Sequence, residues 1–439
     1  MNLFSILERA AAKWPDALAV VDHRQQITYR QLQAAGESLA RGLQQAGLRQ
    51  TDKVGVVFPR GIEDLVACFA VARLGGTVVQ ISPASKSAEV AGVSKKLDFD
   101  ALMYSPAYES LIPRDQGEAP QNLAVERFPV CIQRSAQHRT SDAEREQLST
   151  LNAVAIGFSS GTTAESKAII LSHEALLARA RAEAEHFSIR EGDKILYLLS
   201  ITYGFAPPTT AAVLSGASLL VADAGAPERI RQLVADYGVN LIYAAPLNYR
   251  MILNKETSVA ECFRGARSLV STGSRLPDSV LDEYGTRVGH DIVNRYGLNE
   301  CGMVCANLSH NRAKRGSIGT PAGCDVRLAG ENGASSHDEF SGELLVRGPG
   351  MFEGCASPWR SREEFSQDGW FRTGDLARRD KDGHYWIIGR IKDMINVGGL
   401  KVIPTEVEEV LLGHRDVDEA LVFGVVDPRF GEVPHAKIK

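Results

Sequence analysis

The sequence of 439 residues lacks several features that define whole classes of protein. It has no apolar run approaching the roughly 20 residues that span a bilayer, and its start, Met1-Asn2-Leu3-Phe4, lacks a secretory signal. Seven scattered cysteines without a Cys-x2-Cys pair argue against a disulfide framework or a zinc site. A formal net charge of -5 gives no electrostatic case for nucleic acid as a partner. We therefore expect a cytoplasmic protein with reduced thiols, no membrane span and no nucleic-acid partner.

The order of strand-like and helix-like segments predicts an α/β fold with more than one subdomain. The apolar run 54–58, the helical pattern 62–74 and the strand-like run 77–81 form a strand–helix–strand unit, which predicts a parallel sheet. From residue 317 to about 390, short strands alternate with Gly, Pro and Asp turns, so we expect a β-rich module resembling a small barrel. The polar segment from about 113 to 148 is expected to be irregular.

Capping residues mark two helix starts. Thr28 and Gln31 have the spacing of a capping box, in which each side chain bonds the other residue's backbone. Ser172 precedes a long run rich in alanine and glutamate, where its hydroxyl can cap the first turn. Both patterns predict a helix that begins at the next residue.

A loop of small and hydroxyl-bearing residues follows the apolar run 153–158 and reads Ser159-Ser160-Gly161-Thr162-Thr163-Ala164-Glu165-Ser166-Lys167. Backbone N–H groups, two threonine hydroxyls and one ammonium can surround a polyphosphate there. The Walker A spacing is absent, so the loop favours an enzyme that uses ATP differently from ordinary NTPases. The alternative is a polar turn between two strands.

Three later segments carry further candidate chemistry. In 294–302, Glu300 lies between glycines and can hold Mg²⁺, while Tyr296 can stack on a purine. In 368–376, Asp375 suits a ribose diol because one carboxylate accepts two hydroxyls. The segment 389–399 joins a charged cluster to a glycine pair. Taken singly, the Glu300 and Asp375 segments are more typical of a solvated loop and of a cap or turn, and the third segment can be an exposed hairpin with a salt-bridged arginine.

Taken together and in this order, the four segments resemble the adenylate-forming superfamily, which includes acyl- and aryl-CoA synthetases, luciferases and the adenylation domains of peptide synthetases. The resemblance covers nearly the whole chain. It implies a large N-terminal adenylation domain over 1–390 and the start of a small α+β lid domain over 391–439. It also implies an AMP-forming acid–thiol ligase that uses ATP, Mg²⁺ and coenzyme A.

The resemblance assigns a role to individual positions. The ATP phosphates would be bound by Ser159, Ser160, Gly161, Thr162, Thr163 and Lys167. The adenine segment would comprise Gly273, Ser274, Asn294, Tyr296 and Gly297, and Asn299 replaces a threonine that usually contacts the α-phosphate. Asp375 and Arg390 would bind the ribose, and Glu300 would ligate Mg²⁺. The loop departs from the family pattern at Ala164, Ser166 and Ala168, where Gly, Pro and Gly are usual.

The implied reaction has two steps. The substrate carboxylate attacks the α-phosphorus of ATP to give an acyl-AMP and pyrophosphate, and a thiol then displaces AMP after the lid rotates. Thr162, Lys167, Glu300 and Lys392 would be the catalytic set, with Lys392 at the hinge of that rotation. Gly399 would line the path of the pantetheine arm.

The acid-binding positions implied by the resemblance are Ile201, Tyr203, Ala245, Leu298 and Cys301. They favour an apolar or aromatic carboxylic acid, although the same side chains are also typical of an ordinary core. The stretch 199–205 contains no aspartate that could bind an α-amino group, which argues against an amino acid as the substrate.

Family members continue for about 70 residues beyond this point, and that extension carries a lysine that drives adenylation. We therefore expect this chain to bind ATP and the acid but to adenylate slowly. Coenzyme A is the leading acceptor. The alternatives are an acyl-AMP ligase that loads a carrier protein and a catalytically impaired module that binds a nucleotide or acyl ligand. The sequence leaves monomer and homodimer both open.

Overall fold

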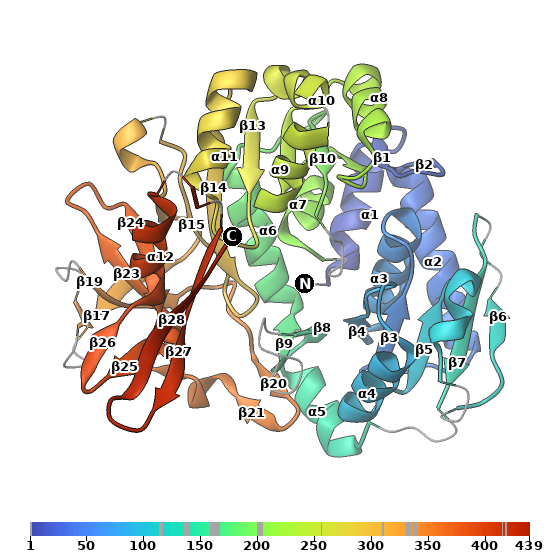
Figure 1. Cartoon of the computed structure of the whole chain (residues 1–439). Helices are drawn as coiled ribbons and strands as arrows, with labels where there is room; N and C mark the ends of the chain where they lie inside the picture. Colours follow the sequence, from blue (N-terminus) through green and yellow to red (C-terminus); the bar gives the residue numbers. More distant parts are fainter. Residues whose placement is uncertain are drawn as a thin grey trace.

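The structure is a computed structural model that describes residues 2–113, 117–123, 125, 127–135, 140–158, 167–199, 205–255, 257–309, 311–330, 335–336, 341–414, 416–417 and 419–439. Figure 1 shows a large body of stacked sheets and helices; most of the last part of the chain, in orange and red, forms a group of strands on the left, while the orange strands β20 and β21 lie below the body. None of the helices described there is long and apolar enough to cross a membrane.

The first large sheet has nine strands in the order β16-β15-β14-β13-β12-β10-β11-β1-β2. Its strands are β1 (Leu18–Val21), β2 (Gln26–Thr28), β10 (Lys194–Tyr197), β11 (Ser218–Val221), β12 (Leu241–Ala244), β13 (Ser268–Ser271), β14 (Ile292–Leu298), β15 (Gly302–Ala306) and β16 (Thr320–Pro321). The pairs from β1 through β11, β10, β12 and β13 to β14 are parallel, whereas β14 and β15 form an antiparallel hairpin.

The second large sheet also has nine strands, in the order β21-β20-β9-β8-β4-β3-β5-β7-β6. Its strands are β3 (Lys53–Val57), β4 (Thr77–Gln80), β5 (Ala101–Tyr104), β6 (Gln121–Leu123), β7 (Val130–Arg134), β8 (Ala153–Phe158), β9 (Ala168–Ser172), β20 (Gly354–Ala356) and β21 (Trp359–Ser361). Strands β3 and β4 are parallel and flank helix α3 (Ile62–Leu74), which confirms the predicted strand–helix–strand unit.

The expectation of an irregular segment over 113–148 is wrong in part. Strand β7 lies in this range and pairs with β5 over four residue pairs, and helix α5 (Asp142–Thr150) begins in it. The apolar part of β7 is the run Val130, Cys131 and Ile132, which is buried on both faces and is too short to be distinguished from a loop by its pattern alone.

The helices form three layers around the two large sheets. They are α1 (Phe4–Lys13), α2 (Tyr29–Gln45), α3, α4 (Ser87–Leu97), α5, α6 (His173–His186), α7 (Pro207–Ser215), α8 (Pro227–Tyr237), α9 (Pro246–Lys255), α10 (Thr257–Glu261), α11 (Asp278–Glu283) and α12 (Pro404–Leu412). Helices α1, α2, α3, α6 and α7 contribute to the core between the sheets; α8 to α11 cover the outer face of the first sheet, and α4 and α5 that of the second.

Side-chain alternation along the strands explains this layering. In β10, Ile195 and Tyr197 belong to the core between the sheets, whereas Leu196 belongs to the core under α8 to α11. In β4, Val78 faces the central layer and Val79 faces the opposite side. Because both faces of each central strand are buried, these strands are apolar along their whole length.

The β-rich range that the sequence predicted contains a six-stranded sheet made of β17 (Asp325–Ala329), β18 (Ser335–Ser336), β19 (Ser341–Arg347), β22 (Ser366–Gln367), β23 (Trp370–Arg379) and β24 (Tyr385–Arg390). The β-rich range is not a self-contained unit, because β20, which lies between β19 and β22 in the chain, pairs with β9 of the second large sheet. The last sheet has the order β26-β25-β28-β27 and comprises β25 (Ile395–Val397), β26 (Leu400–Val402), β27 (Ala420–Asp427) and β28 (Gly431–Ile438).

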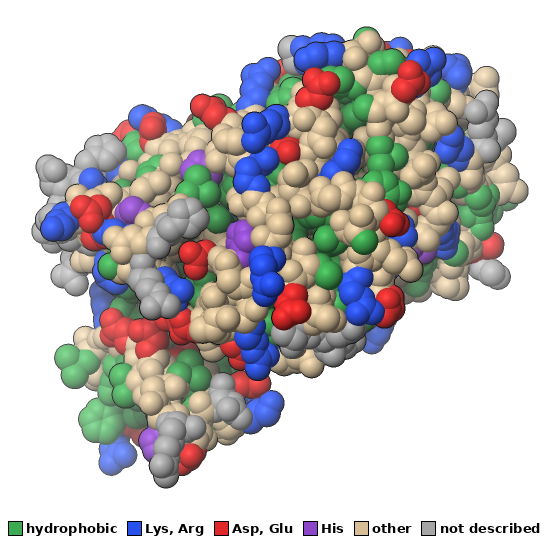
Figure 2. Space-filling view, turned by 90° about the horizontal axis from the view of Figure 1, so that it is seen from above, with side chains coloured by type: hydrophobic (Ala, Val, Ile, Leu, Met, Phe, Trp, Pro, Cys, Tyr) green, Lys and Arg blue, Asp and Glu red, His purple; other side chains and the backbone are tan. Residues whose placement is uncertain are grey.

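Exposed apolar side chains gather on the last group of elements, which comprises β25 to β28 and helix α12. Of the ten exposed large hydrophobic residues in the described part of the chain, seven lie here: Leu400, Val410, Leu412, Leu421, Val426, Phe430 and Ile438. Figure 2 shows green side chains on the small lobe at the lower left, while basic and acidic side chains are interspersed over the larger body. An apolar surface of this kind is typical of a region that contacts other protein segments.

Both predicted helix caps are confirmed. The Gln31 N–H donates to the Thr28 hydroxyl at 3.4 Å, and the Gln31 side chain accepts from the Thr28 N–H at 3.0 Å. At the start of α6, the Ser172 hydroxyl accepts from the Ala175 N–H at 3.1 Å. Caps of this type contribute about 1 kcal/mol each to stability.

A buried carboxyl on α3 makes the stability of the fold depend on pH. Asp64 is only 4% exposed and accepts two hydrogen bonds of 2.8 Å from the Gln80 amide. Burial raises the pKa of Asp64 from 3.8 to about 8. Between these values the folded protein holds a proton that the unfolded chain releases, so this stabilisation is fully present below about pH 4 and is lost as the pH rises through 8.

We predict that Asp64→Asn flattens the pH dependence of stability. Its free energy of unfolding should fall less steeply than that of the wild type between pH 5 and 8, by up to about 1.4 kcal/mol per pH unit. Urea unfolding across this range measures the slopes, with Asp236→Asn on the exposed face of α8 as the control. Parallel profiles for the wild type and Asp64→Asn would contradict the assignment.

Candidate functional site

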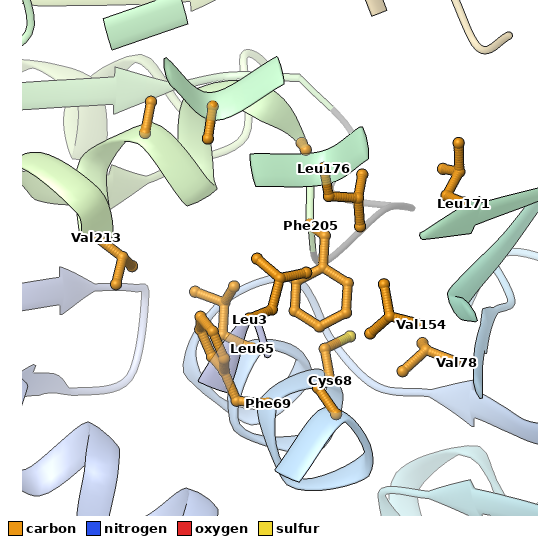
Figure 3. Packing of buried hydrophobic residues seen from close by; sticks show 14 of the residues in the cluster. Leu3, Leu65, Cys68, Phe69, Val78, Val154, Leu171, Leu176, Phe205 and Val213 are labelled. Atoms are coloured by element: carbon orange, nitrogen blue, oxygen red, sulfur yellow. The ribbon is translucent and has the colours of Figure 1, made fainter. Parts of the chain in front are cut away.

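A cavity of about 300 Å³ opens between the two large sheets. Its walls come from β4, β8, β9, β10, helix α6, the residues at the start of α7 and the turn between β14 and β15. Most of the lining is apolar, and it includes Val78, Leu171, Leu176 and Phe205. Figure 3 shows the Phe205 ring between Leu176 on one side and Cys68 and Phe69 of α3 on the other. The volume is at the lower end of the range for small-molecule sites.

The turn between β14 and β15 lies at the end of β8. Phe158 is the last residue of β8, and its carbonyl accepts a hydrogen bond of 2.6 Å from the Asn299 side chain. The Glu300 carbonyl accepts from the Phe352 N–H at 2.7 Å, which holds the turn from the other side. The strand end that precedes the predicted phosphate loop and the turn that contains Asn299 and Glu300 therefore meet at one edge of the cavity.

Several predicted residues fall outside the described part of the chain. They are Ser159, Ser160, Gly161, Thr162 and Thr163 of the phosphate-binding loop, and Ile201 and Tyr203 of the acid pocket. The described strands on each side of the loop are antiparallel, with Phe158 opposite Ala168. Beside Ala168, the Lys167 ammonium lies 4.8 Å from the centre of the Phe365 ring, a cation–π contact.

Two glycines of the predicted adenine segment line the cavity wall. Gly273 follows β13 with a positive φ of 94°, and no atom lies within 4 Å of where a Cβ would be. Ser274 next to it is exposed. At Gly297 a Cβ would lie 2.6 Å from the Gly302 carbonyl oxygen, so only glycine allows β14 and β15 to approach this closely.

The predicted ribose and purine residues form one hydrogen-bonded network. The Tyr296 hydroxyl donates to one carboxylate oxygen of Asp375, and the Arg390 guanidinium lies 2.8 Å from the other. Asp375 is 2% exposed. Burial and the Asp375 charge raise the pKa of Tyr296, so its phenol stays protonated and donates. Nearby, the Asn294 amide donates to the Ser317 carbonyl at 3.0 Å.

A buried ion pair lies beside the cavity. Arg295 on β14 donates to Glu183 on α6, at 3.0 and 3.1 Å from Nε and at 2.7 Å from Nη2. The Glu183 side chain is fully buried and that of Arg295 is 8% exposed. Burial alone would lower the pKa of Arg295, but the charge and hydrogen bonds of Glu183 outweigh it and raise that pKa. Arg295 also donates to the Thr272 hydroxyl at 3.3 Å.

The predicted hinge residue lies just before the last sheet, and the predicted pantetheine residue lies within it. Lys392 is exposed on the short 3₁₀ turn Ile391–Asp393 that follows β24. Gly398 and Gly399 form the two-residue turn between β25 and β26, with φ of 59° and 96°. Positive φ at both positions is what a tight hairpin turn of this type requires.

Of the predicted acid-pocket residues, the structure brings Leu298 to the cavity wall. Ala245 and Cys301 are not among the described residues that line it. Sequence reasoning missed Gln80 and Arg179, which do line it. A signal for Arg179 exists in the sequence, because Arg179 and Glu183 recur at helical spacing with the apolar residues that α6 buries.

A profile of the AMP-binding enzyme family matches residues 7–355. The chain belongs to this family. It is 30% identical over 447 residues to the pyochelin synthase PchD of Pseudomonas aeruginosa (strain UCBPP-PA14), a match that covers 98% of this chain and 82% of that protein. It is 28% identical over 439 residues to a feruloyl-CoA synthase of Amycolatopsis sp., covering 98% of this chain and 87% of that protein.

Solved structures show the same fold. ATP-bound MatB from Rhodopseudomonas palustris superposes with a TM-score of 0.82 at 25% identity, covering all 100% of this chain and 88% of that one. The o-succinylbenzoate CoA synthetase MenE from Bacillus subtilis, in complex with its acyl-adenylate intermediate, gives 0.81 at 23% identity, with coverage of 100% and 88%. The predicted α/β class and the adenylate-forming, acyl- and aryl-CoA synthetase type are confirmed, and the protein is an AMP-forming ligase.

The family implies ATP and coenzyme A as co-substrates, and the residues present fit a nucleotide. No atom lies within 4 Å of the Cβ position at Gly273, which leaves room for a ligand beside the backbone, and a carboxylate such as Asp375 has about four acceptor sites, of which the described protein groups use two. In the described residues no group of three or more His, Cys, Asp or Glu could enclose a metal ion. Glu300 alone is compatible with Mg²⁺, which binds through one or two carboxylates, phosphate oxygens and water.

We predict that Arg295→Met destabilises this AMP-binding enzyme by about 3–5 kcal/mol, because it leaves the Glu183 carboxylate buried without a partner. The double variant Arg295→Met with Glu183→Leu should recover most of that loss, since no unpaired charge remains. Chemical denaturation measures both. A single variant that unfolds within about 1 kcal/mol of the wild type would show that the pair is not a structural constraint.

Proposed function

We propose that this enzyme uses ATP to activate an apolar or aromatic carboxylic acid as its acyl-AMP and then transfers the acyl group to coenzyme A. The observation that carries the proposal is the hydrogen bond from Asn299 to Phe158. It places the turn that bears Glu300 at the root of the 159–167 segment, on the rim of a largely apolar cavity. This supports the proposal, because the candidate phosphate loop begins at the residue after Phe158 and the acid-pocket candidate Leu298 lines the same cavity.

In the first step, an oxygen of the substrate carboxylate attacks the α-phosphorus of ATP. The bond to the bridging oxygen breaks, and pyrophosphate leaves with the electron pair. Both reactants are anions, so the protein must position them and offset their charge. Lys167 and Arg390 would supply positive charge. Glu300 would hold Mg²⁺, which supplies neutralisation of the phosphate charge.

In the second step, a thiolate sulfur attacks the acyl carbon and AMP leaves. Lys392 and Gly399 lie on elements after β24, in keeping with a hinge and a thiol path. The named relatives include coenzyme A ligases and a pyochelin synthase, so a carrier-protein thiol is the alternative acceptor. The apolar walls of the cavity support an apolar or aromatic acid body.

ATP–pyrophosphate exchange with a panel of aliphatic and aromatic acids tests the proposal on the full chain. Acid-dependent exchange is the expected result, followed by thioester formation when coenzyme A is added. Thioester formation with a carrier protein but not with coenzyme A would replace the acceptor while leaving the first step in place. Nucleotide binding without exchange for any acid would instead support a binding module.

We predict that Glu300→Gln raises the Mg²⁺ concentration for half-maximal exchange by about tenfold or more, because the amide cannot neutralise the metal. Mg²⁺ titrations of exchange rate measure the shift. Glu191→Gln, at an exposed turn far along the chain from the site, is the matched control and should titrate like the wild type. An unchanged Mg²⁺ dependence in Glu300→Gln would remove Glu300 as the metal ligand.

A further inference from the structure

Two arginines line the cavity, and only one of them has a carboxylate partner. Arg295 pairs with Glu183. Arg179, one turn earlier on α6 than Glu183, is 7% exposed and makes no ion pair with any residue that the structure describes. Burial lowers the pKa of Arg179 to about 10, so the group remains charged at neutral pH.

The hydrogen bonds of Arg179 use backbone carbonyls only. Its Nε donates to the Gly350 carbonyl at 2.6 Å and its Nη2 to the Asn299 carbonyl at 3.0 Å. Within the described chain, Nη1 of Arg179 has no hydrogen-bond acceptor. It is also not one of the fully buried polar atoms that lack a partner, so Nη1 is accessible to a ligand. The guanidinium is therefore held in place from one side and has donor capacity left on the other.

In the described lining no carboxylate contacts this guanidinium, while the charges of Glu300 and Glu353, outside that lining, act to raise the pKa of Arg179. The described lining contains Arg179 and Arg295 but no Asp or Glu. A buried cation that contacts no carboxylate is costly, and an anionic ligand in contact with it would offset that cost.

We propose that Arg179 binds a second oxyanion of the substrate, so that the enzyme prefers compact acids bearing a further carboxylate or sulfonate on an apolar body. This inference rests on the proposed function and specifies its substrate class. The second oxyanion fits better than the reacting carboxylate. A guanidinium paired with the attacking group would stabilise the reactant more than the transition state, in which that charge disperses.

Calorimetric binding of matched acids, without ATP, tests the proposal independently of catalysis. The pairs are hexanoate with hexanedioate and benzoate with benzene-1,3-dicarboxylate, and 3-sulfobenzoate distinguishes sulfonate from carboxylate. We expect the wild type to bind the doubly anionic member at least tenfold more tightly. Equal affinities, tighter binding of the mono-acid or no binding of any acid would overturn the proposal.

Variants of α6 locate the effect. Arg179→Met should abolish the preference for the doubly anionic acid, and Arg179→Lys, which keeps the charge, should retain part of it. Arg181→Met removes an exposed arginine from the same helix and should keep the wild-type ratio. If Arg179→Met instead weakens both members of each pair equally, Arg179 holds the reacting carboxylate or the turn, and the proposal fails.

Exchange assays on the same acids separate this inference from the proposed function. Exchange with mono-acids but not with doubly anionic acids would keep the function and reject the role of Arg179. Tighter binding of doubly anionic acids without exchange for any acid would support the role of Arg179 and reject the function. Thermal unfolding of each variant shows whether it is folded before binding is compared.

Discussion

Helix α6 carries two charged side chains into the layer between the large sheets, and the site depends on how those charges are satisfied. Glu183 is neutralised by Arg295 of β14, and Arg179 is held by two backbone carbonyls. An unpaired charge in this layer would cost several kcal/mol. The ion pair and these two hydrogen bonds together fix the helix against β14, against the turn that follows it, and against the loop at Gly350.

Strand β14 connects helix α6 to the other elements of the site through the hydrogen bonds of successive side chains. Its side chains alternate, so Arg295 binds α6 while Asn294 and Tyr296 bind partners in later parts of the chain. At its end, Asn299 binds the last residue of β8 in the other large sheet. One strand thus carries the candidate purine residues, binds the candidate ribose residue Asp375, lines the cavity and leads into the turn that binds Phe158.

The last group of elements is attached more lightly than the body is held together. The ion pair between Arg275 and Glu409 is exposed on both sides, and such pairs contribute at most about 1 kcal/mol. The Thr405 hydroxyl donates to the Ile388 carbonyl beside it. A light attachment directly after the Ile391–Asp393 turn suits a segment that changes its orientation between two half-reactions, as the proposed function requires.

Local order in this protein was determined by the sequence alone. The Thr28 and Ser172 caps, the strand–helix–strand unit around α3 and the glycine positions at the turns depend on neighbours within a few residues. The electrostatics of the cavity were decided by the tertiary structure. The partners Glu183 and Arg295 are 112 residues apart and Phe158 and Asn299 are 141 apart. No local sequence pattern predicts which buried charged residue forms an ion pair, because that depends on which strands and helices pack together.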